Sequence, residues 1–281
     1  FVVRPGMDDR PHFSPDGRWV AFLSNDGDGA GWAHDVHVCV APASGGAPRN
    51  ITPDFADIVC GTNADTDPAW DADSRSLLFV SSLRTSVHLF RAFLEPRAVE
   101  PFTQGDGVND WPSSGGSTGA LAWTHEDATH PGELWVRDSA RGRPRRFTDL
   151  NPWTRERTAF PARVVRWPGA GGREVEGLLY LPPNARPGAR APLLVYLHGG
   201  PAANHAQYFT PALDLMGRVE FLQEGWAVLL PNPRGSSGYG SEWRLASTRD
   251  WANGPYEDIV RGVDALILAD PGLMAYAART H

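Results

Sequence analysis

The 281 residues predict two folds in succession: part of a β-propeller, about three blades, over residues 1–160, and part of an α/β domain with a parallel sheet over residues 161–281. Three observations lead to this prediction. A strand–turn–strand motif recurs in the first part. Each copy closes on an apolar residue followed by threonine. After residue 160 the pattern changes to continuous apolar runs that alternate with helical segments, which is typical of an α/β domain.

The recurring motif is clearest in two segments that lie 57 residues apart. Residues 11–22 return as residues 68–79, with proline, aspartate, arginine and phenylalanine at matching positions. A shorter third copy at 119–124 places Trp123 where Phe79 stands in the second. Turn residues between aromatic and β-branched runs are typical of hairpins, so each copy predicts a pair of antiparallel strands.

A further strand and a closing threonine follow each copy. The strands are predicted at 35–41, 86–93 and 133–138, and the closing pairs are Ile51-Thr52, Phe102-Thr103 and Phe147-Thr148. The threonines are 51 and 45 residues apart, close to the roughly 40–50 residues of a four-stranded propeller blade. Three blades do not close a propeller, which needs about four to eight, so we expect part of one. An irregular β-sandwich is the alternative.

The second part begins with a predicted hairpin, 164–181, around a glycine-rich turn. Continuous apolar runs at 192–197 and 226–230 are typical of buried parallel strands. Between them, Thr210 can cap a helix that ends at Gly225. Strand, helix and strand in this order predict the parallel sheet.

A last helix is predicted to start at Pro255. Glu257 and Asp258 would lie in its first turn, where the helix dipole favours acidic side chains. Its apolar face would carry Ile259, Val260, Val263, Leu266 and Ile267. We expect no further strand in residues 272–281.

Composition excludes several classes of function. All 26 basic residues are arginine, which excludes Schiff-base lysines, Ser–Lys dyads and P-loop lysines. The net charge of −7 and the lack of a basic stripe argue against nucleic acid as a partner. No apolar run approaches the roughly 18 residues that span a membrane, so we expect no membrane partner. Cys39 and Cys60 could be thiols or one bridge.

No signal-peptide pattern is visible near the first methionine, Met7. We therefore expect a cytoplasmic protein, with a periplasmic or secreted location as open alternatives. We expect no cofactor and no metal site. The segment 125–130 is one residue longer than H-E-x-x-H, so its two histidines would not share a helix face.

Two loops follow the two buried strands, at the carboxyl edge where α/β sheets bind ligands. The first is His198-Gly199-Gly200-Pro201. Two glycines after a strand can present backbone N–H groups to the oxyanion of a tetrahedral intermediate. The alternative is a tight turn that needs positive φ. The second loop is Asn232-Pro233-Arg234-Gly235-Ser236-Ser237-Gly238-Tyr239-Gly240.

These two loops, together with the run from Asp250 to Ile259, resemble the prolyl oligopeptidase family of serine peptidases, particularly its acylaminoacyl-peptidase and dipeptidyl-peptidase-like branch. The resemblance implies a β-propeller followed by an α/β-hydrolase domain that acts on short peptides. It implies that the Gly200 N–H contributes to the oxyanion hole. Arg234, Gly235 and Tyr239 would belong to an adjacent loop, in which Arg234 and Tyr239 are mainly structural.

The chain departs from the family pattern after Ala269-Asp270-Pro271. The family continues there into a strand and a G-x-S-x-G-G elbow that carries the nucleophile, followed by the catalytic aspartate and histidine. These are absent from residues 272–281, so we expect the chain alone to be inactive. Ser117 matches G-x-S-x-G but precedes a strand instead of a helix, and Ser236 and Ser237 have the wrong glycine spacing.

Two other functions fit parts of this pattern. One is a non-catalytic propeller that binds a partner and carries a degenerate hydrolase remnant. The other is a carboxylesterase-like hydrolase that shares the histidine–glycine–glycine loop, although the propeller repeats count against it. The function that the resemblance favours is peptide hydrolysis by a serine peptidase.

Overall fold

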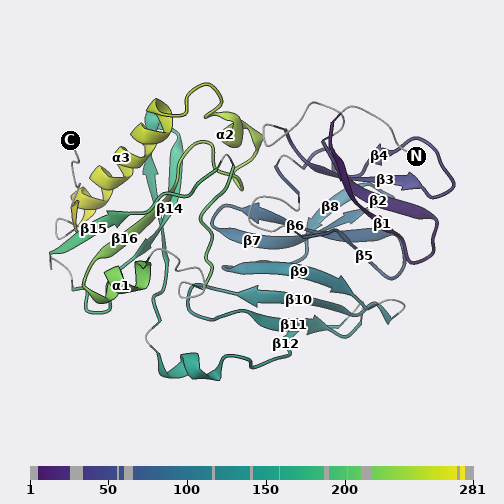
Figure 1. Cartoon of the computed structure of the whole chain (residues 1–281), viewed down its shortest axis with the longest axis horizontal. Helices are drawn as coiled ribbons and strands as arrows, with labels where there is room; N and C mark the ends of the chain where they lie inside the picture. The colour runs from purple at the N-terminus through teal and green to yellow at the C-terminus, as the bar shows by residue number, and fades with distance from the viewer. Residues whose placement is uncertain are drawn as a thin grey trace.

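The computed structural model describes residues 6–25, 34–55, 57–59, 66–115, 118–139, 142–157, 159–186, 190–200, 202–209, 217–270 and 273–275. The strands form two groups, which lie side by side in Figure 1: the N-terminal strands on the right and the C-terminal sheet on the left. No helix within these residues is long and apolar enough to cross a membrane.

The N-terminal group consists of three four-stranded antiparallel units, as the repeats predict. The first unit contains β1 (Asp8–Phe13), β2 (Trp19–Ser24), β3 (His37–Pro42) and β4 (Arg49–Asn50). The second contains β5 (Ala69–Trp70), β6 (Ser76–Leu83), β7 (Ser86–Phe93) and β8 (Ala98–Pro101). The third contains β9 (Val108–Ser114), β10 (Leu121–Glu126), β11 (Glu133–Arg137) and β12 (Arg145–Arg146). A single parallel bridge, Val87 to Val108, joins the second unit to the third.

The repeated aspartates form the first hairpin turn in two of these blades. Asp16 Oδ1 accepts the backbone N–H of Arg18 at 3.0 Å, and Asp73 Oδ1 accepts that of Arg75 at 2.9 Å. The same side chain therefore folds the same turn at the same repeat position. This is the local, sequence-encoded bond that an Asx turn provides.

The closing threonines also have one common role. Their hydroxyl oxygens accept the backbone N–H of a residue 14 positions earlier on the third strand of the blade. The pairs are Val38 to Thr52 at 3.0 Å, Leu89 to Thr103 at 3.0 Å and Leu134 to Thr148 at 2.9 Å. Threonine recurs because each blade needs a short acceptor where its last strand leaves the sheet.

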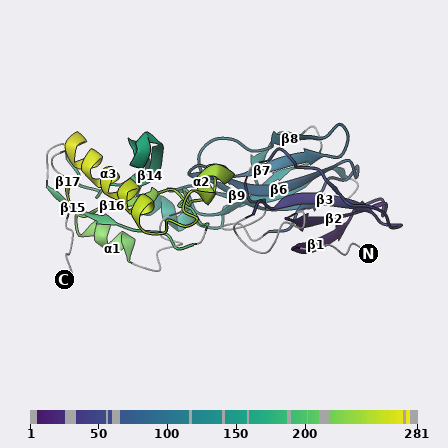
Figure 2. The same ribbon diagram turned by 90° about the horizontal axis from the view of Figure 1, so that it is seen from above.

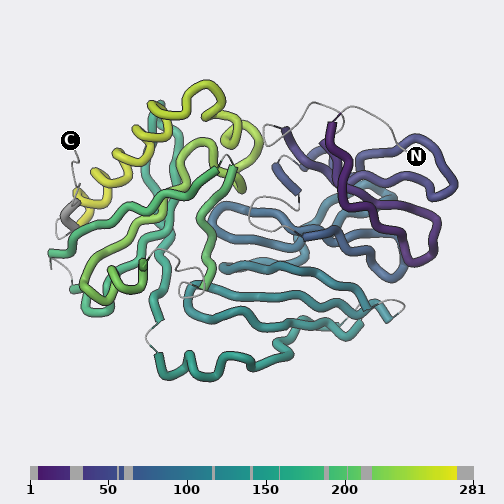
Figure 3. The backbone as a smooth tube through the Cα atoms, in the orientation of Figure 1, coloured from purple at the N-terminus to yellow at the C-terminus, as the bar shows by residue number. Residues whose placement is uncertain are grey.

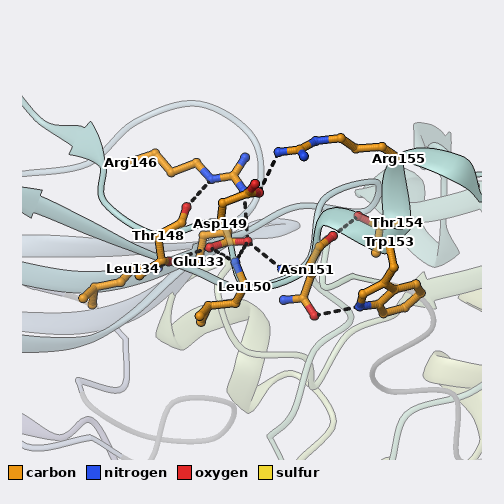
Figure 4. Close-up of polar contacts among 10 residues, drawn as sticks. All are labelled: Glu133, Leu134, Arg146, Thr148, Asp149, Leu150, Asn151, Trp153, Thr154 and Arg155. Carbon is orange, nitrogen blue, oxygen red and sulfur yellow. Dashed lines mark hydrogen bonds and ion pairs between the residues drawn. The ribbon is translucent and has the colours of Figure 1, made fainter.

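The third blade differs from the other two at the residue that precedes the N–H donor to the closing threonine. His37 and His88 occupy this position in the first two blades, and Glu133 occupies it in the third. The buried Glu133 carboxylate accepts the N–H groups of Leu150 at 2.9 Å and Asn151 at 3.3 Å, as Figure 4 shows. Glu133 therefore fixes the path of the chain as it leaves the third blade toward the 3₁₀ helix η2 (Pro152–Glu156).

The C-terminal sheet has five strands in the order β13-β14-β16-β15-β17. Their bounds are β13 (Arg163–Pro168), β14 (Glu174–Tyr180), β15 (Ala191–Val195), β16 (Ala227–Asn232) and β17 (Leu273–Ala275). The predicted hairpin β13–β14 turns through the 3₁₀ helix η3 (Ala170–Gly172). The antiparallel β14 joins this hairpin to β16, and β16, β15 and β17 are parallel to one another. The predicted parallel strands are confirmed within a mixed sheet.

Helices cover both faces of this sheet, as Figure 2 shows. Helix α3 (Asn253–Ala269) packs on one face through Val263 and Leu266. Helix α1 (Arg218–Gln223) packs on the other through the buried Leu222. A short third helix, α2 (Ser241–Leu245), lies toward the propeller.

Two predictions for this part change. Helix α3 begins at Asn253, so Glu257 and Asp258 lie beyond its first turn and the dipole argument for them is wrong. Strand β17 forms where we expected no strand, and it pairs with β15. The predicted cap at Thr210 lies outside the described residues, although Gly225 ends α1 with a φ of +88° as predicted. Cys39 is buried in β3, and Cys60 also lies outside the described residues.

Candidate active site

The two candidate loops leave the same edge of the C-terminal sheet, because they follow the parallel neighbours β15 and β16. This edge lies against the propeller. The segment that follows β15 runs along the boundary between the two strand groups in Figure 3. There the Gln207 N–H donates to Thr85 O at 3.0 Å, and the Ser82 and Asn204 side chains lie 3.2 Å apart. The predicted site is therefore built at the contact between the two groups.

The loop after β15 contains the half-buried His198 and the exposed Gly199 and Gly200; Pro201 lies outside the described residues. Neither glycine has a positive φ. A Cβ atom added to Gly199 would meet no atom within 4 Å, and one added to Gly200 would only reach Ala202 N at 3.4 Å. The tight-turn interpretation is therefore wrong, because the backbone at these glycines does not need the left-handed region.

The His198 ring connects the two loops. Its Nδ1 lies 2.8 Å from Gly199 O, and its Nε2 lies 2.9 Å from the Ser236 hydroxyl of the loop after β16. The ring also meets His205 edge to face, with ring centroids 5.0 Å apart. Burial lowers the pKa of His198 below its ordinary value. The imidazole is thus a neutral group at neutral pH.

The loop after β16 is clamped to α3 by Arg234. Its guanidinium donates to both oxygens of Asp258 at 2.8 Å and to Ala170 O at 2.8 Å, and its backbone N–H donates to Asp258 at 3.0 Å. The Asp258 side chain is completely buried. This hydrogen-bonded ion pair raises the pKa of Arg234. A bidentate arginine–carboxylate pair fixes direction as well as distance.

Gly235, next along this loop, has a φ of +98°. A Cβ atom there would lie 2.5 Å from Ser247 Oγ. Glycine is therefore required at 235 for both the backbone conformation and the close packing of the next segment.

Asn232 ties the two loops together at the end of β16. Its side chain accepts the His205 N–H at 2.7 Å and donates to His205 O at 3.0 Å and to the Tyr239 hydroxyl at 3.0 Å. Asn232 has 0% exposed surface. Burial of Tyr239 raises the pKa of its phenol above the ordinary value, so the hydroxyl stays neutral.

The propeller supplies a carboxylate to the same loop. Asp57 Oδ2 accepts the N–H groups of Gly238 at 2.8 Å and Gly240 at 3.1 Å. The fully buried Arg244 of α2 lies beside Asp57 and also bonds Asp35 of the propeller. Burial raises the pKa of Asp57 above its ordinary value.

A propeller hairpin tip supports the loop from a second side. The backbone N–H of Arg84, between β6 and β7, donates to Gly238 O at 2.7 Å. The Arg84 guanidinium bonds Glu176 of β14 and lies over the Tyr239 ring, 5.6 Å from its centroid. Two separate propeller segments therefore determine where Tyr239 lies.

Sequence reasoning missed the partners that hold these loops. Asp57, Asp258 and Ser236 each bond a loop residue, yet none could be assigned that role from spacing alone. Their signals were weak. Asp258 stands out in the sequence as a helix acid within the run from Asp250 to Ile259, with no sign of its partner Arg234. Asp57 lies between repeats, where the blade pattern gives no register.

The structure gives no described serine an exposed position in these loops, since Ser236 and Ser237 are 0% and 1% exposed. Ser117 lies outside the described residues. Among the residues that the structure describes, no group of three or more histidine, cysteine or acidic side chains could hold a metal ion. What the described site can offer is a backbone donor loop and a rigid support for it.

Comparison with known proteins shows which family part of the chain resembles. The family model described as the prolyl oligopeptidase family matches residues 213–272, which include β16, its loop and α3. Residues 213–272 of the chain therefore match the prolyl oligopeptidase family. Members of this family are serine peptidases.

Curated relatives of the family match most or part of the chain. Dipeptidyl-peptidase 5 of Porphyromonas gingivalis is 24% identical over 263 residues, which are 93% of this chain and 36% of that protein. Dipeptidyl-peptidase 5 of Aspergillus oryzae is 33% identical over 89 residues, 32% of this chain and 12% of that protein. The chain thus spans about a third or less of the length of these relatives.

Solved structures of prolyl oligopeptidase-family proteins show the same fold. Acylaminoacyl peptidase of Pyrococcus horikoshii is 21% identical, with a TM-score of 0.73 over 92% of this chain and 38% of that one. Dipeptidyl peptidase 4 of Porphyromonas gingivalis is 18% identical, with a TM-score of 0.69 over 92% and 35%. The predicted fold class, a partial β-propeller followed by a partial α/β-hydrolase domain, is confirmed.

Proposed function

We propose that this chain forms part of a serine peptidase that hydrolyses short peptides at the carboxyl edge of β15 and β16. The observation that carries the proposal is the pair of loops held at this edge, with the exposed Gly199-Gly200 backbone in the first of them. The relatives named above, dipeptidyl and acylaminoacyl peptidases, support peptides as the substrate class.

In this mechanism a serine attacks the peptide carbonyl, a histidine takes its proton and returns it to the leaving amine, and an aspartate orients the histidine. The Gly200 N–H donates to the oxyanion of the tetrahedral intermediate. One such donor contributes about 3 kcal/mol of transition-state stabilisation. The loop after β16, anchored by Asp258 and Asp57, supports the donor loop. No metal or cofactor takes part in this scheme.

We also propose that the 281 residues alone do not catalyse the reaction. Ser236 and Ser237 are buried, and the sequence after Asp270 contains no G-x-S-x-G elbow. Residues 1–160 would act as the propeller unit and residues 161–281 as the first part of the hydrolase unit. The propeller would then limit access to short peptides.

The test compares this 281-residue chain with the longest chain that its gene encodes. Both are treated with a fluorophosphonate, and hydrolysis of dipeptidyl and N-acylaminoacyl naphthylamides is measured. We expect labelling and hydrolysis with the longer chain only. Labelling of the 281-residue chain would refute its proposed inactivity. An unlabelled longer chain would favour a binding protein, and cleavage of p-nitrophenyl esters without amides would favour a carboxylesterase.

A further inference from the structure

The protons around His198 follow from what its partners can accept. Gly199 O, 2.8 Å from Nδ1, has no proton to donate. Nδ1 must therefore carry the ring proton when this bond forms. A neutral imidazole has one N–H, so Nε2 is then an acceptor.

Ser236 is the donor that Nε2 needs. Its hydroxyl lies 2.9 Å from Nε2 and 2.7 Å from Pro233 O, and a single proton cannot serve both. Pro233 O already accepts the Ser236 backbone N–H at 3.1 Å and the Trp243 indole N–H at 3.1 Å. A carbonyl oxygen has two lone pairs, so both are used. Pro233 O therefore keeps two other donors when the Ser236 hydroxyl turns its proton from this carbonyl to His198.

The surroundings keep His198 neutral, which makes the choice of tautomer matter. Burial lowers the pKa of His198, and its neighbour His205 has a pKa of about 3 because of burial and the adjacent His198. The His205 Nε2 lies 3.0 Å from Tyr196 O, so that ring donates there and stays neutral. Burial therefore makes a second proton on either ring unfavourable at neutral pH.

The tautomer of His198 determines where the Gly200 N–H points. In a trans peptide unit the C=O of Gly199 and the N–H of Gly200 point in opposite directions. A Nδ1–H that holds Gly199 O therefore turns the Gly200 N–H away from the ring. If the proton moved to Nε2, the Nδ1 lone pair would face the Gly199 oxygen, and this peptide unit would lose its only side-chain restraint among the described contacts.

We propose that Ser236 is a positioning residue that selects the Nδ1–H tautomer of His198 and thereby fixes the Gly199–Gly200 peptide with its N–H presented for an oxyanion. Ser236 is completely buried, so it acts through His198 and does not touch substrate. The inference rests on the proposed role of Gly200 in a peptidase, yet tautomer and peptide orientation are measurable without turnover.

The test is nuclear magnetic resonance on the 281-residue chain labelled with ¹⁵N. In the unmodified chain at neutral pH we expect His198 to show a protonated Nδ1 and an unprotonated Nε2. This measurement needs no variant, so it holds even if a substitution disturbs folding. An Nε2–H tautomer or a fully protonated ring in the unmodified chain would overturn the proposal.

Ser236→Ala then tests the selection itself. We expect a mixture of tautomers and Gly200 amide exchange that is about three- to tenfold faster, because one hydrogen bond is lost. The matched control is Ser247→Ala, a buried serine near the same loop whose hydroxyl has no partner among the described residues. It should leave both readouts unchanged.

An unchanged tautomer and unchanged Gly200 exchange in Ser236→Ala would contradict the proposal, as would an equal effect in Ser247→Ala. The outcome is separate from that of the proposed function. Activity of the longer chain tests peptide hydrolysis, whereas the tautomer of His198 tests only how the donor loop is held.

Discussion

The two loops at the carboxyl edge of β15 and β16 are held in opposite ways. The loop after β16 is anchored by the buried Asp258, by Asp57 from the propeller and by Asn232, which donates to the Tyr239 hydroxyl. In the first part of the loop after β15, from His198 to Gly200, only His198 makes side-chain bonds among the described contacts, and Gly199 and Gly200 are exposed. One loop is a buried framework and the other a lightly held backbone donor.

This difference separates the residues that stabilise the site from those that offer backbone N–H donors. Breaking buried ionic and amide contacts has a large free-energy cost, so these contacts keep the support loop, the loop after β16, in one conformation. The donor loop must leave its N–H groups unoccupied toward solvent, so it cannot be fixed by bonding those groups. The hydrogen bond between His198 Nδ1 and the Gly199 carbonyl holds the loop without using these N–H groups.

The largest expected effect comes from breaking the clamp of the support loop. Asp258→Ala leaves the Arg234 guanidinium, with a side chain only 16% exposed, without its carboxylate. Removing one partner of a buried pair costs about 3 to 5 kcal/mol. Urea unfolding followed by tryptophan fluorescence measures this loss. Glu257→Ala, on the same helix in an exposed pair with Arg261, should change stability by less than about 0.5 kcal/mol. Equal losses of stability in the two variants would show that the buried pair contributes no more than the exposed pair.

A glycine from each loop sharpens the comparison. Gly235→Ala forces a side chain into left-handed backbone and against Ser247, so it should cost about 2 to 4 kcal/mol. Gly199→Ala meets no atom within 4 Å and should stay within about 0.5 kcal/mol. Thermal unfolding of the two variants side by side tests this. A costly Gly199→Ala would show that the donor loop is part of the framework.

Asn232 belongs to both loops, so its loss should have an intermediate effect. Asn232→Ala leaves the His205 N–H and C=O without their partner, which costs about 1 to 3 kcal/mol. Tyr239→Phe removes only the hydroxyl that Asn232 contacts and should cost less, about 1 kcal/mol. Urea midpoints of the two variants give the order. The reverse order would indicate that Tyr239, and not Asn232, connects the loops.

The smallest effect is a pH dependence at the propeller contact. Burial raises the folded-state pKa of Asp57 above its unfolded value of about 4. The folded state then binds more protons, so this group's contribution is greatest below pH 4 and is lost as the pH rises through the raised pKa. The stability of the unmodified chain relative to Asp57→Asn should therefore fall as the pH rises above about 4. Unfolding at a series of pH values measures the slope, and a rise would contradict the assignment.

Much of the fold could be predicted because its signals are local. The aspartate turns and closing threonines repeat along the chain, and the structure gives each copy the same bond. The apolar runs before His198 and Asn232 predicted adjacent strands because a buried parallel strand needs no alternation. The end of the sheet was predicted less well, since β17 is only three residues long and is held by pairing with β15.

The sequence by itself predicted the blade repeats, a change of fold near residue 160, and the two loops that resemble those of the prolyl oligopeptidase family. Only the tertiary structure decided which groups hold those loops. Asp57 reaches Gly238 across 181 positions of sequence, and Ser236 reaches His198 across 38. Such partners depend on how two sheets pack, and neither the hydrophobic periodicity nor the turn residues of the sequence indicate that packing. Local bonds are encoded where they occur, whereas long-range bonds exist only once the chain has folded.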